Sequence, residues 1–112
     1  MILVVGYCIL LSSNRYKFKT VSFNQPTSNE PISIPGNGLL TTCFAIRATT
    51  DVNIHMKINN TRVWRYRKYS YNSGSTTDCV TAAIPVGVGS TVVFTGLGND
   101  VVVETCTLLQ WN

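Results

Sequence analysis

The stretch VNIHMKINNTRVWRYRKY, residues 52–69, decides the fold. Its first seven residues alternate between apolar and polar side chains, and the apolar positions are Val52, Ile54, Met56 and Ile58. Successive side chains of a strand point to opposite faces, so this alternation predicts a strand with one buried face. Asn59 and Asn60 follow it, and asparagine tolerates the positive φ of a two-residue hairpin turn. The segment therefore predicts a β-hairpin whose return strand runs over residues 62–71.

Short segments rich in β-branched residues lie on both sides of this hairpin. We predict strands over residues 15–23, 39–48, 78–84, 91–95 and 101–111, with a short edge strand at 32–34. Turns with Gly, Pro and Asn separate them, and Pro85 is expected to end the strand at 78–84. Strands at roughly ten-residue spacing predict an all-β fold, an antiparallel β-sandwich of jelly-roll type with about eight strands. We expect one domain over residues 1–112.

The apolar start MILVVGYCILL, residues 1–11, has three interpretations. It is a strand buried on both faces, the apolar part of a signal peptide, or the remnant of a longer chain. The β-branched residues favour the strand. The segment is shorter than the roughly 20 residues that a membrane-spanning helix needs, so we expect no membrane insertion.

The composition favours contacts between subunits or with neutral ligands. Only 12% of residues are charged, and the formal net charge is +4. Nucleic-acid-binding domains usually carry denser basic clusters, so we expect no nucleic-acid partner. A surface of low charge is easily desolvated, which suits contacts between subunits.

No catalytic or metal-binding constellation is recognisable in the sequence. The four cysteines have no metal-like spacing, so they are either buried free thiols or, in a secreted protein, disulfide partners. The single histidine, His55, is expected at the surface or at an interface, since one histidine alone makes no metal site. Asp51, Asp78 and Asp100 lie beside turns, where aspartate bonds to the local backbone. We therefore predict no enzyme activity, no cofactor and no metal.

The most unusual segment is TRVWRYRKYSY, residues 61–71, in which aromatic and basic residues interleave. Strict alternation places Arg62, Trp64, Tyr66 and Lys68 on one face and the remaining side chains on the other. Aromatic rings stack on sugars, and arginine binds carboxylate or phosphate. The predicted ligand-binding residues are Trp64, Arg65, Tyr66, Arg67 and Tyr69. The alternative is an edge strand whose tryptophan covers the core and whose charges prevent edge-to-edge aggregation. In that case the loops at 72–77 and 96–100 are the next candidates.

Residues 32–111 resemble the C-terminal tip domains of phage tail fibres and tailspikes. The resemblance lies in an ordered series of motifs: PGNGLLTTCFAIRA, VNIHMKINNTRV, YSYNSGSTTDCVTAAI and PVGVGSTVVF, followed by an apolar strand. The sequence differs at Gly87-Val88-Gly89-Ser90, where the family tends to have Lys-Gly-Asp. Residues 1–31, expected to hold N-terminal strands and a loop, lie outside it.

The resemblance implies a jelly-roll-like receptor-binding tip that recognises bacterial surface polysaccharide or lipopolysaccharide. It also implies a homotrimer located on the virion, or otherwise an extracellular protein. We place strand 101–111 near the threefold axis, because its apolar residues exceed what one sheet face can bury. Two other classes stay open: a free-standing carbohydrate-binding module, and a trimeric ligand head like those of tumour necrosis factor and complement. A capsule depolymerase domain is a third, enzymatic alternative.

Overall fold

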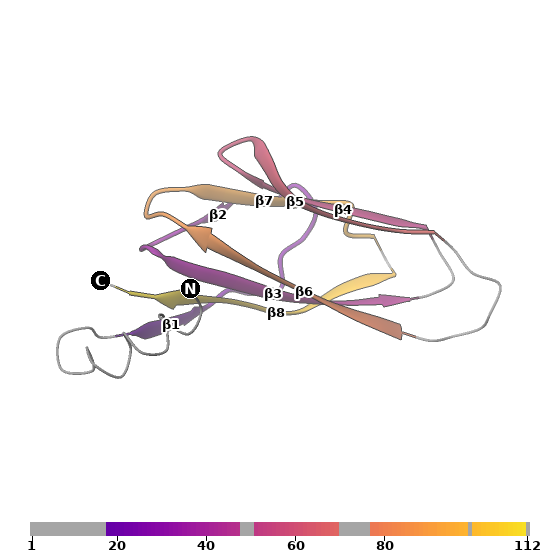
Figure 1. Cartoon of the computed structure of the whole chain (residues 1–112), viewed down its shortest axis with the longest axis horizontal. Coiled ribbons are helices and arrows are strands. Elements are labelled where there is room, and N and C mark those ends of the chain that lie inside the picture. Colours follow the sequence, from indigo (N-terminus) through magenta and orange to yellow (C-terminus); the bar gives the residue numbers. More distant parts are fainter. Residues whose placement is uncertain (1–17, 48–50, 70–76, 99, 112) are drawn as a thin grey trace, which may run out of the picture.

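The computed structural model describes residues 18–47, 51–69, 77–98 and 100–111, and these form a two-layered β-sandwich (Figure 1). The strands are β1 (Lys19–Ser22), β2 (Ile32–Ser33), β3 (Gly38–Arg47), β4 (Val52–Ile58), β5 (Thr61–Lys68), β6 (Thr77–Val86), β7 (Thr91–Thr95) and β8 (Val101–Gln110). One sheet has the order β1-β8-β3-β6 and the other β2-β7-β4-β5. Most connections cross from one sheet to the other, which is the connectivity of a jelly roll. The predicted fold class is confirmed.

The core lies between the two sheets and is built by alternate residues of each strand. Phe44 and Phe94, from opposite sheets, are both fully buried and meet edge to face with 5.7 Å between ring centroids. From β4, Val52, Ile54 and Met56 are buried, and Ile58 packs against the core from a half-buried position. The predicted inward face of this strand is therefore confirmed.

The turn between β4 and β5 has the predicted backbone conformation. Asn59 and Asn60 have φ values of 49° and 69°, the left-handed region that asparagine adopts more readily than other residues with a side chain. The Asn59 side chain also accepts a hydrogen bond from the backbone N–H of Thr91 at 3.0 Å. This bond ties the hairpin tip to the start of β7.

The ends of β6 and β5 differ from the prediction by two or three residues. Strand β6 continues through Pro85 to Val86 instead of ending before the proline. Because β6 is an edge strand, Pro85 needs no amide hydrogen on its outer side, which is the position where a sheet tolerates proline. Strand β5 ends at Lys68, before the predicted end at residue 71.

The N-terminal part of the described chain belongs to the same sandwich. Strand β1 pairs antiparallel with β8, and Val21 packs against the core. The strand predicted over residues 15–23 is found at Lys19–Ser22, where only Val21 is half-buried and the other three residues are exposed. Residues 15–17 and the predicted strand at residues 1–11 lie outside the described residues. Within the described ranges, no helix is long and apolar enough to cross a membrane.

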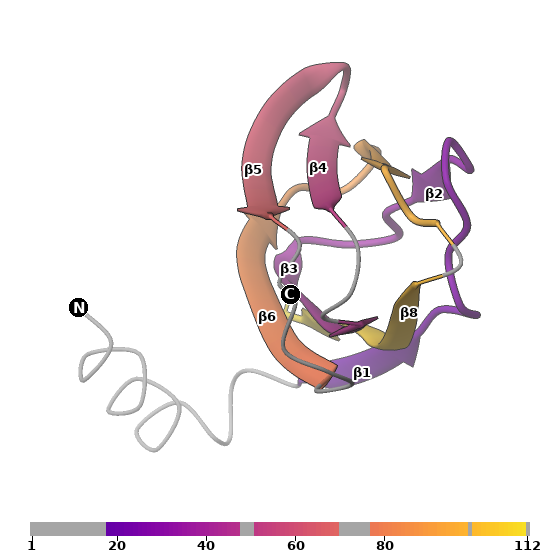
Figure 2. The same ribbon diagram turned by 90° about the vertical axis from the view of Figure 1, so that its right-hand side faces the viewer.

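An ion pair joins the two sheets along one side of the sandwich, where β5 runs above β6 (Figure 2). The Lys68 ammonium donates to the carboxylate of Asp78. The lysine side chain is only 3% exposed and the aspartate side chain 44% exposed, so the pair is partly shielded from water. It fixes the end of β5 to the start of β6, and thereby orients the strand that holds the arginines.

Candidate functional site

The outer surface of β4 and β5 is a basic face, and its outward side chains are Asn53, His55, Lys57, Arg62, Arg65 and Arg67. Antiparallel pairing places them in three rows, since directly opposed residues share one side of a sheet. Arg67 lies opposite Asn53, Arg65 opposite His55, and Arg62 opposite Lys57. Successive rows lie about 7 Å apart along the strands. The face is therefore a short ladder of positive charge.

A β-bulge in β5 brings Arg62 onto this face. The pairing shifts between Met56, which faces Trp64, and Lys57, which faces Arg62, so Val63 is the extra residue. A bulge places one additional residue against its partner strand and resets the alternation. The prediction that Arg62 shares a face with Trp64 is therefore wrong: Arg62 joins the other arginines.

The basic face has no acidic side chain within its own sheet. None of the strands β2, β4, β5 and β7 contains aspartate or glutamate. Asp51, immediately before β4, lies at one end of the ladder, and Glu30 bonds to Thr27 in the loop before β2. The arginines and Lys57 are therefore surrounded mainly by other positive charges, which is the electrostatic setting of an anion-binding surface.

The structure divides the five predicted ligand-binding residues between two environments. Arg65, Arg67 and Tyr69 are exposed on the outer side. Trp64 and Tyr66 face inward and pack against the core, and Trp64 stacks on Phe44 with 5.4 Å between ring centroids and 7° between ring planes. The five residues thus do not form one exposed patch. The reason is the period of two in a strand, which sends alternate side chains into the sandwich.

Tyr69 extends the exposed part of the site. Its residue is 63% exposed, and the Arg67 guanidinium lies 4.7 Å from the ring centroid. This distance is within the range of a cation–π contact, which holds both side chains in a defined position. An aromatic ring beside arginines offers a stacking surface next to anion-binding groups.

His55 lies in the middle of the basic face, half-buried between β5 and β7. It lies opposite Arg65 on one side and Thr95 on the other, and its Nε2 is 3.1 Å from Asn53 Oδ1. Partial burial, followed by the charges of Arg62, Arg65 and Lys57, holds the pKa of His55 below its ordinary value. The sequence prediction of a surface position fits, but nothing in the sequence alone placed His55 among the arginines.

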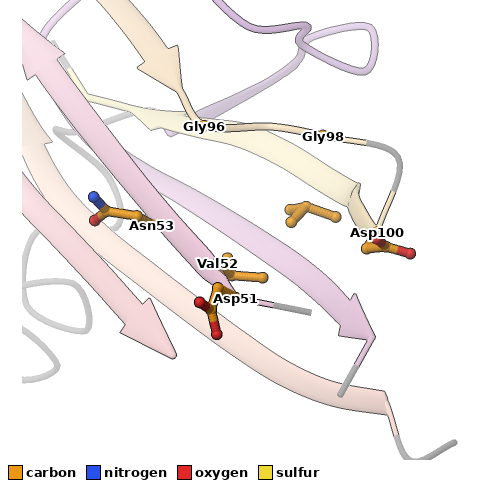
Figure 3. Close-up of a pocket in the computed structure, with 7 residues that line it drawn as sticks. Asp51, Val52, Asn53, Gly96, Gly98 and Asp100 are labelled. Carbon is orange, nitrogen blue, oxygen red and sulfur yellow. The ribbon is translucent and has the colours of Figure 1, made fainter. Parts of the chain in front are cut away.

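A separate pocket of about 300 Å³ opens at one end of the sandwich, and the residues that line it are Asp51, Val52, Asn53, Gly96, Gly98, Asp100 and Val101. Gly96 has a φ of 85°, and a Cβ at this position would overlap the carbonyl oxygen of Asn53. Figure 3 shows the carboxylates of Asp51 and Asp100 pointing in different directions. A glycosidase needs two carboxyl groups that converge on one bond. The pocket does not present these two carboxylates in that way.

This pocket contains part of the second set of candidates from the sequence. Gly96, Gly98 and Asp100 belong to the loop predicted as a reserve site, whereas most of the loop at 72–77 lies outside the described residues. Among the residues that the structure describes, no group of three or more His, Cys, Asp or Glu side chains could hold a metal ion.

The outer surface of the other sheet has almost no charge, and we call it the neutral face. Its outward residues include Leu39, Thr41, Cys43, Ala45, Cys79, Thr81, Ala83, Pro85, Val102, Thr107 and Leu109. Within the strands of this sheet, the charged residues nearest to the neutral face are Arg47, at the end of β3, and Glu104, beside a bulge in β8. The neutral and basic faces lie on opposite outer sides of the sandwich.

The three described cysteines are free thiols in different environments. Cys106 is buried, and burial raises the pKa of its thiol. Cys43 lies on the neutral face, where hydrogen bonds from Thr81 and Thr105 lower the pKa of its thiol. Cys79 is exposed on the same face. The prediction of buried thiols is therefore confirmed for Cys106 and wrong for Cys79, while Cys8 lies outside the described residues.

Comparison with protein-family models and with curated proteins found no match to this chain.

Proposed function

We propose that this chain is a non-enzymatic receptor-binding tip domain of a phage tail fibre or tailspike. Its ligand would be an acidic glycan of a bacterial surface, polysaccharide or lipopolysaccharide. The observation that carries this proposal is the basic face, on which Arg62, Arg65, Arg67 and Lys57 lie together in a sheet without acidic residues. Jelly-roll connectivity and the ordered tip-domain motifs support the same function.

Ligand binding rests on the exposed residues of the original candidate set. Arg65 and Arg67 would donate paired hydrogen bonds to carboxylate, sulfate or phosphate groups of the glycan, a geometry that suits the planar guanidinium. Tyr69, held beside Arg67, would stack on a sugar ring. Trp64 and Tyr66 would support the strand from inside the sandwich without touching the ligand.

Assembly as a homotrimer would use the neutral face. Four strands about 4.8 Å apart, with the longer ones about 30 Å long, present a projected area near 600 Å². That approaches the roughly 800 Å² per partner of a stable interface. Val102 and Leu109 of β8 are 47% and 37% exposed on this face, in keeping with a position of β8 close to the threefold axis.

The test of binding is a titration of the full chain with acidic and neutral bacterial polysaccharides at several salt concentrations. An Arg65→Gln, Arg67→Gln double variant should bind the acidic polymer at least about tenfold more weakly, with a smaller dependence on salt. Arg47→Gln is the matched control, because Arg47 is an exposed arginine on the other sheet. Equal binding by the double variant and the wild type would refute the basic face as the site. Preferential binding to a single-stranded oligonucleotide would show that the ligand is a nucleic acid and not a glycan.

Mass measurement under native conditions separates the open alternatives. A trimer supports the fibre tip or a trimeric ligand head, whereas a monomer at tens of micromolar supports a free-standing carbohydrate-binding module. A Leu109→Glu substitution should dissociate the trimer, because a charge in the centre of an apolar contact costs several kcal/mol. Release of soluble sugar from the polymer would instead support the depolymerase alternative.

A further inference from the structure

We propose that His55 is a proton-carrying contact of the anion site, so that the domain takes up a proton as it binds an acidic polymer. This inference rests on the proposed function, since it concerns the same basic face. It adds a residue that the sequence did not assign to the site, and it makes the affinity dependent on pH.

The position of His55 carries the argument. The imidazole lies in the middle row of the ladder, directly opposite Arg65. Arg62 and Arg67 flank Arg65 along β5. Lys57 follows two residues after His55 on β4. The backbones of His55 and Arg65 lie one strand spacing apart, about 5 Å, with both side chains on the same outer face, so an anionic group bound by Arg65 lies on the side of the sheet that the imidazole occupies.

The hydrogen bond to Asn53 leaves one ring nitrogen for the incoming proton. In the neutral ring, Nε2–H can donate to Asn53 Oδ1 at 3.1 Å, and Nδ1 then has a lone pair. Protonation at Nδ1 creates a second donor and a positive charge without breaking this bond. The protonated ring can then donate to the anion beside Arg65.

The surroundings of His55 oppose its protonation until a ligand is present. Thr95 of β7 is uncharged, Arg65 of β5 is positive, and Lys57 on β4 is positive. Among the described acidic residues near this sheet, Asp51 lies four residues away on the extended chain, about 13 Å. Glu30 lies beyond β7, where its neighbour Asn29 bonds to Phe94.

The direction of the pH effect follows from these charges. In the free protein partial burial, and then the charges of Arg62, Arg65 and Lys57, hold the pKa of His55 below its ordinary value, which favours the neutral ring. A bound anion offsets those charges and raises the pKa of the ring. Affinity therefore increases as the pH falls through the pKa of the complex, and it levels off below the pKa of the free protein. The change is about tenfold for each unit by which the ligand raises the pKa.

The experiment uses the full chain and a sulfated dextran, whose sulfate groups stay charged between pH 5 and pH 8. His55 is the only histidine of the chain, so a titration in this range reports mainly on it. We expect several-fold tighter binding at pH 5.5 than at pH 8. Calorimetry in two buffers of different ionisation enthalpy should detect proton uptake near pH 6.

Two variants test whether the pH dependence of binding and the proton uptake come from His55. His55→Gln should lose the pH dependence and the proton uptake, while Thr95→Val, a neutral neighbour on the opposite side of His55, should keep both. Binding that is salt-dependent but constant between pH 5 and pH 8 in the wild type would overturn this inference and leave the proposed function standing. Absence of binding at every pH would overturn both.

Discussion

Replacement of Trp64 by alanine tests whether this residue stabilises the sandwich. Trp64 stacks on the fully buried Phe44 but is itself only half-buried. Removal of a fully buried tryptophan costs about 3–5 kcal/mol, so a half-buried ring should cost about 2–3 kcal/mol. About 1 kcal/mol of this is the ring stacking itself. At about 4 °C per kcal/mol for a chain of this size, Tm should fall by about 8–12 °C.

The assays are thermal denaturation for Tm and urea denaturation for the free energy of unfolding, both followed by circular dichroism, which does not depend on the fluorescence of the deleted residue. Tyr69→Ala is the matched control, since Tyr69 follows the same strand and is 63% exposed. It should change the free energy of unfolding by less than about 0.5 kcal/mol. A Tm for Trp64→Ala within about 2 °C of the wild type would contradict the inward packing. Trp64 would then return to the list of ligand contacts.

Three further substitutions test the fold. Ile54→Ala should lower the free energy of unfolding by about 2–5 kcal/mol in urea denaturation, because Ile54 is fully buried; a loss below about 1 kcal/mol would argue against the register of β4. Gly96→Ala should cost at least about 1 kcal/mol more than Gly89→Ala, since both have positive φ but only Gly96 has backbone where a Cβ would lie; equal losses would remove the steric argument. Asp78→Asn should cost about 1–2 kcal/mol by taking a carboxylate from the buried Lys68 ammonium, and adding Lys68→Met should recover most of it. A single variant as stable as the wild type would show that the ion pair does not stabilise the link between the sheets.

The alternation in β4 was sufficient to predict its buried face and its turn. Strand periodicity is a local property, and two successive asparagines favour the backbone of a tight hairpin. The number of strands and their approximate spacing along the chain could be predicted for the same reason. Pro85 was misjudged because its effect depends on whether the strand lies at a sheet edge, and this is decided by pairing with distant residues.

The site was only partly predictable, since its composition depends on contacts between strands. The bulge at Val63 arises from the register of β5 against β4, and no residue in the sequence marks it. Lys68 lies on the same inward face as Trp64 and Tyr66, but its pairing with Asp78 depends on how the other sheet packs against β5. His55 joined the arginines only when the hairpin was paired. The aromatic–basic composition indicated the correct strand but not which residues are exposed.

Alternate residues of strand β5 are under different structural constraints. Its inward residues Trp64 and Tyr66 are held by core packing, whereas Arg65 and Arg67 are exposed to solvent. Substitutions at the outward positions should therefore change ligand preference with little loss of stability. Such a strand is a favourable place for rapid sequence diversification, because variants with new specificity keep the same folded scaffold and remain open to further selection.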